Sequence, residues 1–360
     1  MTTQKGEESV EKIGIDWNSR ADITQDQLVD LFWNSQLSIM DQHVPCKGDC
    51  NEHFIYWWHA HVIDVLTDGY ERTRNSKYIE RIDLVIEGVR RLNGNTLIHN
   101  YYDDMEWMAL ALLRVYDVTQ REIYKELTMI LWVNIQTAWN DQMGGGMAWK
   151  KDQLYYKNTP ANAPASILAS RLYQRFNQEE DLYWARKIYH WNKDNLVDPS
   201  NGFVWDGLNR LGDGKIDYDW EYTYCQGVFI GAGIELYHIT GETIYLEDAV
   251  RTAETALLHF VDQESGMLPN EGEDDCGLFK GIFVRYLHQL LIIRPEHVHV
   301  RHMLLHNATV LWESGRNEKG LISRSWKGDI EKVVQLCAQL SGIMLIEVAA
   351  SIGETQSETN

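Results

Sequence analysis

A recurring pair of tyrosines is the feature that most constrains how this 360-residue chain can fold. In each copy an apolar stretch ends in a first Tyr, and a polar turn leads to a second Tyr that opens an amphipathic stretch. The copies pair Tyr70 with Tyr78, Tyr116 with Tyr124, Tyr173 with Tyr183, and Tyr237 with Tyr245. The first Tyr recurs at spacings of 46, 57 and 64 residues. Such a period is typical of stacked helix pairs.

Each repeat predicts one buried and one solvent-facing helix. The first helix is apolar nearly all round, as in 105–115, whereas the second carries charges on one face, as in 245–260. Two further pairs are predicted over Phe279–Ile293 with Glu296–Trp312, and over Ile330–Ser351 with Gln25–Met40. Six inner and six outer helices predict an all-α fold, a closed (α/α)6 toroid. An open solenoid of helix pairs is the alternative.

The chain shows no sign of a boundary between domains. Only 6 of its residues are Pro, and no stretch is rich in Pro, Ser or Gly. We therefore predict one (α/α)6 domain over residues 1–360, in which 1–20 form a flexible N-terminal segment and 352–360 a flexible tail.

Charge and hydropathy limit the classes of partner. The formal net charge is −20, whereas nucleic acid and anionic membrane surfaces both demand a basic face. No apolar run approaches the roughly 18 to 20 residues of a membrane span, and the N-terminus lacks the order of a signal peptide. We expect no nucleic acid and no membrane as partner, and a cytoplasmic protein unless a leader was trimmed.

The five cysteines are scattered and odd in number, which is typical of reduced thiols. Cys46 and Cys50, with His43 and His53 nearby, have the spacing of one zinc pair, but no second Cys/His pair follows. We expect no metal and no cofactor.

The connections from each outer helix to the next inner helix are long and share glycines and aromatic residues. Examples begin at Gly144, Asn201, Ser265 and Lys319. In a toroid these connections meet at one end, and long loops are usually functional. Of 40 aromatic residues, 32 are Trp or Tyr, which suits a carbohydrate cleft as well as a helical core.

An acid pair opens the second inner helix at this end. Asp103 and Asp104 are adjacent, and their side chains can splay to place the carboxyl groups about 5 Å apart, as a retaining glycosidase requires. Two like charges so close also drive the two pKa values apart. The plain alternative is helix capping, because Asp103 and Glu106 have capping-box spacing.

Other polar and aromatic residues fall on the same rim. The candidates for substrate binding are Tyr102, Trp107, Trp149, Asn158, Asp206, Tyr224, Gln226, Glu271 and Lys280. Each has an ordinary structural alternative as a loop cap, a solvated turn or an apolar plug of the toroid.

Three histidines support a different enzyme. His59, His61 and His99 lie on or before inner helices and could serve as the bases of an (α/α)6 sugar epimerase or isomerase. A non-catalytic glycan-binding protein and a protein-binding scaffold are further alternatives.

Six motifs, in order, carry a family resemblance from about Trp57 to Leu290. They are 102–111, 144–149, 156–158, 204–207, 222–227 and 279–286, which begin YDDMEW, GGGMAW, YKN, VWDG, YTYCQG and FKGIFV. In this combination the chain resembles glycoside hydrolase family 76, the endo-α-1,6-mannanases. One departure is Cys225, where the family pattern usually has Asn.

The resemblance implies a toroid and a retaining hydrolase of α-1,6-mannosidic linkages in α-mannan or manno-oligosaccharides. Carried over by position, Asp103 would be the nucleophile and Asp104 the acid/base. Spacing alone allows both roles for each residue.

Overall fold

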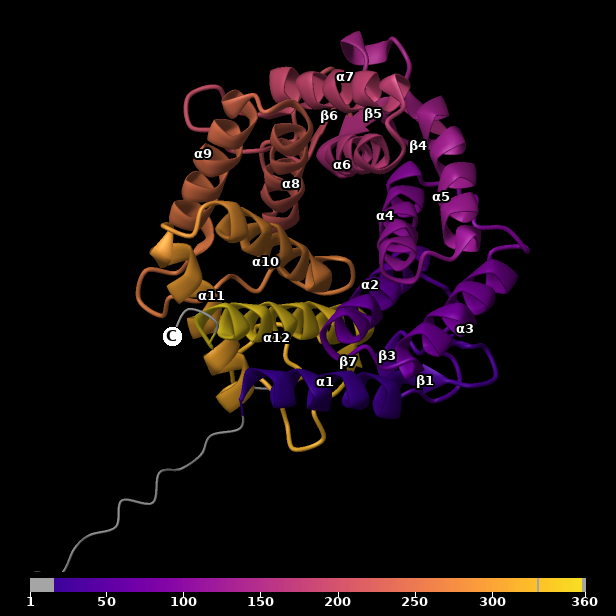
Figure 1. Cartoon of the computed structure of the whole chain (residues 1–360), viewed down its shortest axis with the longest axis vertical. Helices are drawn as coiled ribbons and strands as arrows, with labels where there is room; N and C mark the ends of the chain where they lie inside the picture. The colour runs from indigo at the N-terminus through magenta and orange to yellow at the C-terminus, as the bar shows by residue number, and fades with distance from the viewer. Residues whose placement is uncertain (1–15, 329, 358–360) are drawn as a thin grey trace, which may run out of the picture.

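The computed structural model describes residues 16–328 and 330–357, which form a ring of helix pairs (Figure 1). The inner helices are α2 (Tyr56–Thr73), α4 (Tyr102–Thr119), α6 (Thr159–Phe176), α8 (Thr223–Thr240), α10 (Cys276–Ile293) and α12 (Leu336–Ser357). The outer helices are α3 (Lys77–Leu92), α5 (Glu122–Ile135), α7 (Glu179–Leu196), α9 (Thr243–Phe260), α11 (Val298–Ser314) and α1 (Trp17–Phe32).

The ring is closed. Each inner helix packs against the inner helices on either side, including α12 against α2, and against its own outer partner. The predicted (α/α)6 toroid is confirmed, and the open solenoid is excluded because the last pair, α12 with α1, packs back onto the first.

The first tyrosine of each repeat occupies the same position near the end of an inner helix, in α2, α4, α6 and α8. The carbonyls of Tyr70, Tyr116, Tyr173 and Tyr237 accept the backbone N–H of the residue four positions later. Those later residues, Arg74, Gln120, Asn177 and Gly241, adopt left-handed backbone angles that end the helix. Helices α2, α4, α6 and α8 can therefore each turn into the outer partner within two or three residues.

The bounds of the last pair differ from the prediction. Helix α1 begins at Trp17 because Asp16 caps it by accepting the N–H of Ser19 (2.8 Å). After Phe32 the chain forms the hairpin β1 (Trp33–Asn34) and β2 (Ile39–Met40), so the predicted helix over 25–40 is wrong beyond residue 32. Helix α12 begins at Leu336, because 330–335 belong to the preceding loop.

The segments expected to be flexible overlap these helices. Residues 17–20 belong to α1 and residues 352–357 to α12, whereas 1–15 and 358–360 lie outside the described residues.

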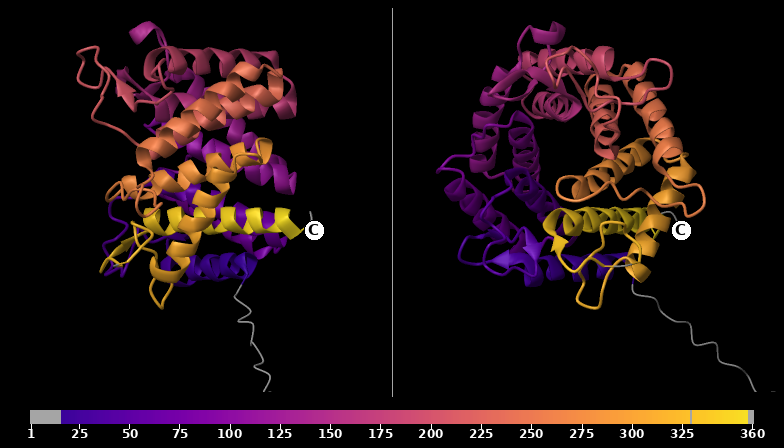
Figure 2. Two further views of the ribbon diagram at one scale, coloured as in Figure 1. Left: turned by 90° about the vertical axis from the view of Figure 1, so that its left-hand side faces the viewer. Right: turned by 180° about the vertical axis from the view of Figure 1, so that it is seen from behind.

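Short strands accompany the long connections at one end of the ring (Figure 2). An antiparallel sheet joins β4 (Ala148–Lys150), β5 (Gln153–Asn158) and β6 (Gly207–Leu208), and β3 (His43–Val44) pairs with β7 (Val334–Gln335). The three-stranded sheet links the connection before α6 to the connection before α8, so the loops at this end brace one another.

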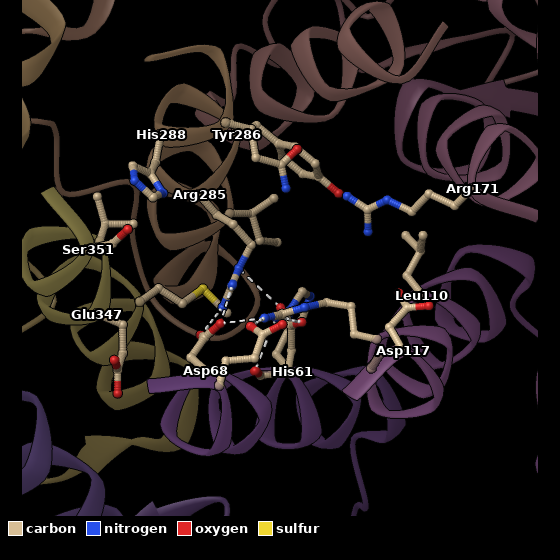
Figure 3. Close-up of a pocket in the computed structure, with 18 of the residues that line it drawn as sticks. His61, Asp68, Leu110, Asp117, Arg171, Arg285, Tyr286, His288, Glu347 and Ser351 are labelled. Carbon is tan, nitrogen blue, oxygen red and sulfur yellow. Dashed lines mark hydrogen bonds and ion pairs between the residues drawn. The ribbon is translucent and has the colours of Figure 1, made fainter. Parts of the chain in front are cut away.

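Ion pairs hold the inner helices together at the opposite end, around a cavity of about 590 Å³ (Figure 3). Arg285 of α10 binds Asp68 (2.6 Å) and Asp64 (3.1 Å) of α2. Arg114 of α4 binds the same two carboxylates and Glu71 (2.6 Å). Further pairs join α6 to α4 through Arg175 and Asp117, α6 to α8 through Arg171 and Glu235, and α2 to α12 through Arg72 and Glu347.

Two inner helices, α10 and α12, are long and apolar enough to cross a membrane. Within the ring, 67% of the α10 window and 89% of the α12 window (Leu336–Gly353) are buried. Their apolar surface is therefore accounted for by the toroid core.

The prediction of five reduced cysteines is wrong for one pair. Cys46 and Cys50 form a disulfide in the loop before α2, whereas Cys225, Cys276 and Cys337 are free. Four residues apart in a turn, the two side chains meet, which the count of cysteines does not show.

Removing Arg114 should destabilise the ring, because Glu71 then loses its ion pair and the buried Asp64 and Asp68 keep Arg285 as their one arginine partner among the described residues. We expect Arg114→Met to lower the free energy of unfolding by about 3 kcal/mol. Lys77→Met, which breaks an exposed pair with Asp26, should change it by at most about 0.5 kcal/mol. Urea unfolding of both variants tests this; equal effects would contradict a role for the buried network.

The disulfide predicts the number of reactive thiols. Alkylation of the unfolded protein without reductant should modify three cysteines, and alkylation after reduction should modify five. Intact mass spectrometry measures both values. Five modified cysteines in the unreduced sample would show that the Cys46–Cys50 bond is absent.

Candidate active site

The acid pair lies in the first turn of α4, at the end of the ring where the loops gather. The residue that caps α4 is Tyr101, whose side chain makes no capping bond. Asp103 lies within the helix, and the side chain of Glu106 is fully buried. The capping-box interpretation is therefore wrong, and the carboxyl groups of Asp103 and Asp104 are left for another role.

Asp103 is held by two N–H donors. Trp149 donates its indole N–H to Oδ2 (3.0 Å), and the backbone N–H of Asp104 reaches Oδ1 (3.1 Å). Trp149 is placed for this because the chain at Lys150 bridges to Tyr101 at the start of α4. Burial, and then the charge of Asp104, raise the pKa of Asp103 well above its usual range, although both donors lower it.

Asp104 has a histidine partner. His99 Nδ1 lies 3.1 Å from Asp104 Oδ2. Burial raises the pKa of Asp104, and the contact with His99 lowers it. Because the two aspartates are coupled, they titrate as a pair. Their raised pKa values allow the pair to hold a proton well above pH 4.

A third acid, Asp275, was missed by sequence reasoning. It precedes α10, and its Oδ1 accepts the indole N–H groups of Trp57 (2.8 Å) and Trp58 (3.0 Å) from α2. Its charge contributes to the raised pKa of Asp103, so it lies near the pair. The available signal was an acid directly before an inner helix, the position that Asp103 and Asp104 occupy on α4.

Aromatic rings lie on the same side of the ring as the acids. Trp149 meets Tyr101 and Tyr156 edge-on, with ring centroids 5.0 and 5.7 Å apart. Tyr224 stacks on Phe279 at 3.8 Å. Trp149 and Tyr224 both remain partly exposed, so each can offer ring surface to a ligand.

Asp206 holds the aromatic wall in position. It is buried and accepts hydrogen bonds from the hydroxyls of Tyr156 (2.9 Å) and Tyr224 (3.1 Å). The Cys225 thiol also approaches it at 3.5 Å, and burial raises the pKa of Asp206. Asp206, itself a predicted binding residue, therefore orients the predicted rim residue Tyr224 and its neighbour Tyr156.

Four predicted binding residues are engaged by the protein itself. Gln226 is fully buried and exchanges hydrogen bonds with the backbone of Val204, and Tyr102 directs its hydroxyl to Thr137 (3.2 Å). Glu271 accepts the N–H and hydroxyl of Thr223, and Lys280 donates to the carbonyl of Pro269 (3.1 Å). These side chains position the starts of inner helices and their loops.

Burial shifts the pKa values of two of these groups, Glu271 and Lys280. Desolvation raises the pKa of Glu271 to about 7 and lowers the pKa of Lys280 to about 7. The two groups attract one another, which opposes both shifts.

Trp107 and Asn158 are also buried. Trp107 packs against His61, with ring centroids 4.9 Å apart, and lines the cavity at the other end of the ring. Asn158 ends β5, and its side-chain oxygen has no protein hydrogen-bond partner. Asn158 therefore has a hydrogen-bond acceptor, unused by the described residues, that a ligand could occupy, whereas the Trp107 indole can only donate.

The three histidines do not converge. His59 is fully buried and contacts the carbonyls of Ile55 (2.9 Å) and Met40 (3.1 Å). His61 lines the cavity at the far end, whereas His99 lies beside Asp104. An epimerase built on these residues would need them around one sugar, and the fold separates them.

Among the described residues, one group of side chains has metal-ligand spacing, and it lies away from the acid pair. It consists of Asp41, Cys46 and Cys50. Because the two sulfurs are bonded to one another, they are not available as thiolate ligands.

Comparison with known proteins agrees with this geometry. The family model of Glycosyl hydrolase family 76 matches residues 16–356. Mannan endo-1,6-alpha-mannosidase DCW1 of Candida glabrata is 23% identical over 283 residues, which cover 71% of this chain and 62% of that protein. The chain thus spans less than two thirds of the length of that curated relative.

Solved structures are similar over nearly the whole chain. The Lin0763 protein of Listeria innocua is 39% identical, with a TM-score of 0.90 over 95% of this chain and 99% of that one. An alpha-1,6-mannanase of Salegentibacter sp. HEL1_6 is 40% identical, with a TM-score of 0.89 over 94% and 100%.

A closed ring of helix pairs with adjacent, partly buried aspartates at one end is the arrangement expected of an (α/α)6 glycoside hydrolase. The chain belongs to glycoside hydrolase family 76, whose model covers nearly all of its length.

Glu106 predicts a pH dependence of stability. Burial, and then the charge of Asp103, raise its pKa well above 4.5, so the folded protein retains a proton that the unfolded chain releases. The stabilisation that this proton provides is complete below pH 4.5 and is lost as pH rises towards the folded-state pKa.

Above pH 4.5, Glu106→Gln should therefore gain stability over wild type as pH rises, by at most about 1.4 kcal/mol per pH unit. Urea unfolding at pH 5, 6 and 7 measures this, and Glu264→Gln, at an exposed position, should follow wild type. Parallel curves for Glu106→Gln and wild type would show that Glu106 ionises normally.

Proposed function

We propose that this protein hydrolyses α-1,6-mannosidic linkages in α-mannan or manno-oligosaccharides by double displacement. The observation that carries the proposal is the acid pair, Asp103 and Asp104, on one helix turn beside the partly exposed ring of Trp149. Adjacent carboxyls can serve as nucleophile and acid/base when they are close and differently hydrogen-bonded.

The hydrogen bonds of the pair support different roles. Asp103 accepts from two groups that can only donate, the indole of Trp149 and a backbone N–H, and such donors stabilise a carboxylate. They act against burial and the charge of Asp104, which raise the pKa of Asp103, so the assignment of roles rests on the hydrogen bonds. Asp103 would therefore attack the anomeric carbon and form a β-linked glycosyl-enzyme. Asp104 would protonate the leaving oxygen and then take a proton from the attacking water.

Related proteins support the choice of substrate. The Salegentibacter enzyme was solved as an inactive variant, with two consecutive aspartates replaced by alanine, in complex with alpha-1,6-mannotetrose. Two pairs of adjacent aspartates occur in the present chain, at 103–104 and 274–275. In the second pair Asp274 is exposed and bonded to Gln335 (2.7 Å), so only the first pair has the enclosed geometry of a catalytic dyad.

The Cys46–Cys50 disulfide favours one kind of cellular compartment for this protein. A structural disulfide is typical of an oxidising environment, whereas the expected cytoplasm keeps thiols reduced. We infer that the protein works in an oxidising compartment, and the thiol count described above tests the premise.

Hydrolysis of α-1,6-linked manno-oligosaccharides, followed by NMR of the anomer first released, tests the activity. Wild type should release the α-anomer. Asp103→Asn and Asp104→Asn should each lose at least about a thousandfold in kcat/KM. Asp194→Asn, an exposed acid on α7, should retain wild-type activity. An inert wild type, or release of the β-anomer, would reject the proposal.

Azide rescue separates the two roles. With an activated mannosyl fluoride, azide should enter from the β-face in Asp103→Ala and give β-mannosyl azide. In Asp104→Ala it should attack the glycosyl-enzyme and give α-mannosyl azide. The opposite pattern of products would exchange the roles of the two residues.

A further inference from the structure

We propose that His99 is a positioning residue for the reaction: it fixes the orientation of the Asp104 carboxyl and donates a hydrogen bond to its ionised form. The inference rests on the proposed function, because it gives Asp104 the acid/base role. The stacking around His99 and its contact with Asp104 carry it.

The imidazole plane is fixed by stacking. The His99 ring lies between Tyr56 and Tyr101, with centroids 4.8 and 5.5 Å away and interplanar angles of 15° and 24°. Tyr56 is itself immobilised, since it is buried and donates its hydroxyl to the carbonyl of Leu97 (2.8 Å). His99 therefore presents one edge to Asp104 without freedom to turn away.

The presented edge meets the carboxyl directly. Nδ1 of His99 lies 3.1 Å from Oδ2 of Asp104. The backbone N–H of Tyr101 also points at this Nδ1, at 3.4 Å, where the nitrogen would act as acceptor. Because the carboxyl oxygen is the closer partner, we assign the Nδ1 proton to the contact with Asp104. An imidazole N–H directed at a carboxylate favours its ionised form and fixes which oxygen remains free for the substrate.

This contact matters because burial raises the pKa of Asp104, whereas His99 lowers it. The charge of Asp104 in turn raises the pKa of Asp103 and Glu106 on the same helix, of Tyr56 on α2, and of Asp275 before α10. Three of these groups are acids and the fourth is a buried phenol, so none of them favours a second negative charge. His99 opposes the effect of burial, so that Asp104 can release its proton to the leaving oxygen and recover one from water. His99 undergoes no net change in protonation in this cycle.

The test compares His99→Phe, which keeps the stacked ring and loses the nitrogen, with His99→Asn, whose amide can place a donor near the position of Nδ1. We expect His99→Phe to lower kcat/KM on α-1,6-mannotriose roughly ten- to a hundredfold. The basic limb of its pH profile should move up by about one pH unit, because Asp104 loses the partner that favours its anion. His99→Asn should recover most of the lost kcat/KM, and the basic limb of its pH profile should lie close to that of wild type.

A second readout separates this role from a purely structural one. On mannosyl fluoride, whose departure needs little protonation, His99→Phe should lose much less activity than on mannotriose. Equal losses on both substrates, an unshifted pH limb, or an Asn variant no better than Phe would overturn the inference.

Failure of the proposed function has a different signature, namely an inert wild type. In that case carboxyl 13C NMR of aspartate-labelled protein still decides the inference. The signal that disappears in Asp104→Asn should titrate at higher pH in His99→Phe than in wild type. An unchanged titration would reject the role of His99.

Discussion

The toroid depends on the rule that a buried charge must be paired. At one end of the ring, arginines of α4, α6 and α10 reach carboxylates of α2, α4 and α8, and Arg72 of α2 reaches Glu347 of α12. Because an unpaired charge there would cost several kcal/mol, each pair limits how far a helix can rotate or slide. The opposite ends of the same helices are thereby placed as well, including the first turn of α4 that carries Asp103 and Asp104.

At the end of the ring that carries Asp103 and Asp104, the carboxyl groups of these two residues have no arginine partner among the described residues. There Asp103, Asp104 and Asp275 gather with indole and imidazole N–H groups as partners and without an arginine among the contacts described. A guanidinium would hold these carboxyls ionised, whereas desolvation and mutual repulsion raise the pKa of the pair. A carboxyl group that is to release and regain a proton needs the environment without a guanidinium, in which its pKa is raised. The contrast between the two ends is thus the difference between holding the fold together and, in the proposed reaction, transferring a proton.

Around the acids, several residues that look like ligands in sequence are supports in the structure. Asp206 orients Tyr156 and Tyr224, Glu271 binds the first residue of α8, and Gln226 binds the backbone at Val204. The loop with Gly145 and Gly146 also has a supporting role. A side chain at either glycine would collide with Trp139 or Trp191, and the two glycines have positive φ angles. A precise mouth requires this second layer because loops without it would leave the acids and rings free to move.

The sequence by itself determined the helix pairs and the acid pair, because both are local in the chain. Each Tyr lies four residues before its left-handed cap, and Asp103 is adjacent to Asp104. Long-range contacts were decided only in the tertiary structure. Asp275 lies more than 170 residues from the pair, and neither the roles of Gln226 and Glu271 nor the Cys46–Cys50 bond can be read from residue type. The physical reason is that a polar side chain becomes a ligand or a support according to what faces it across the ring, and only the closed packing of all six pairs decides what faces it.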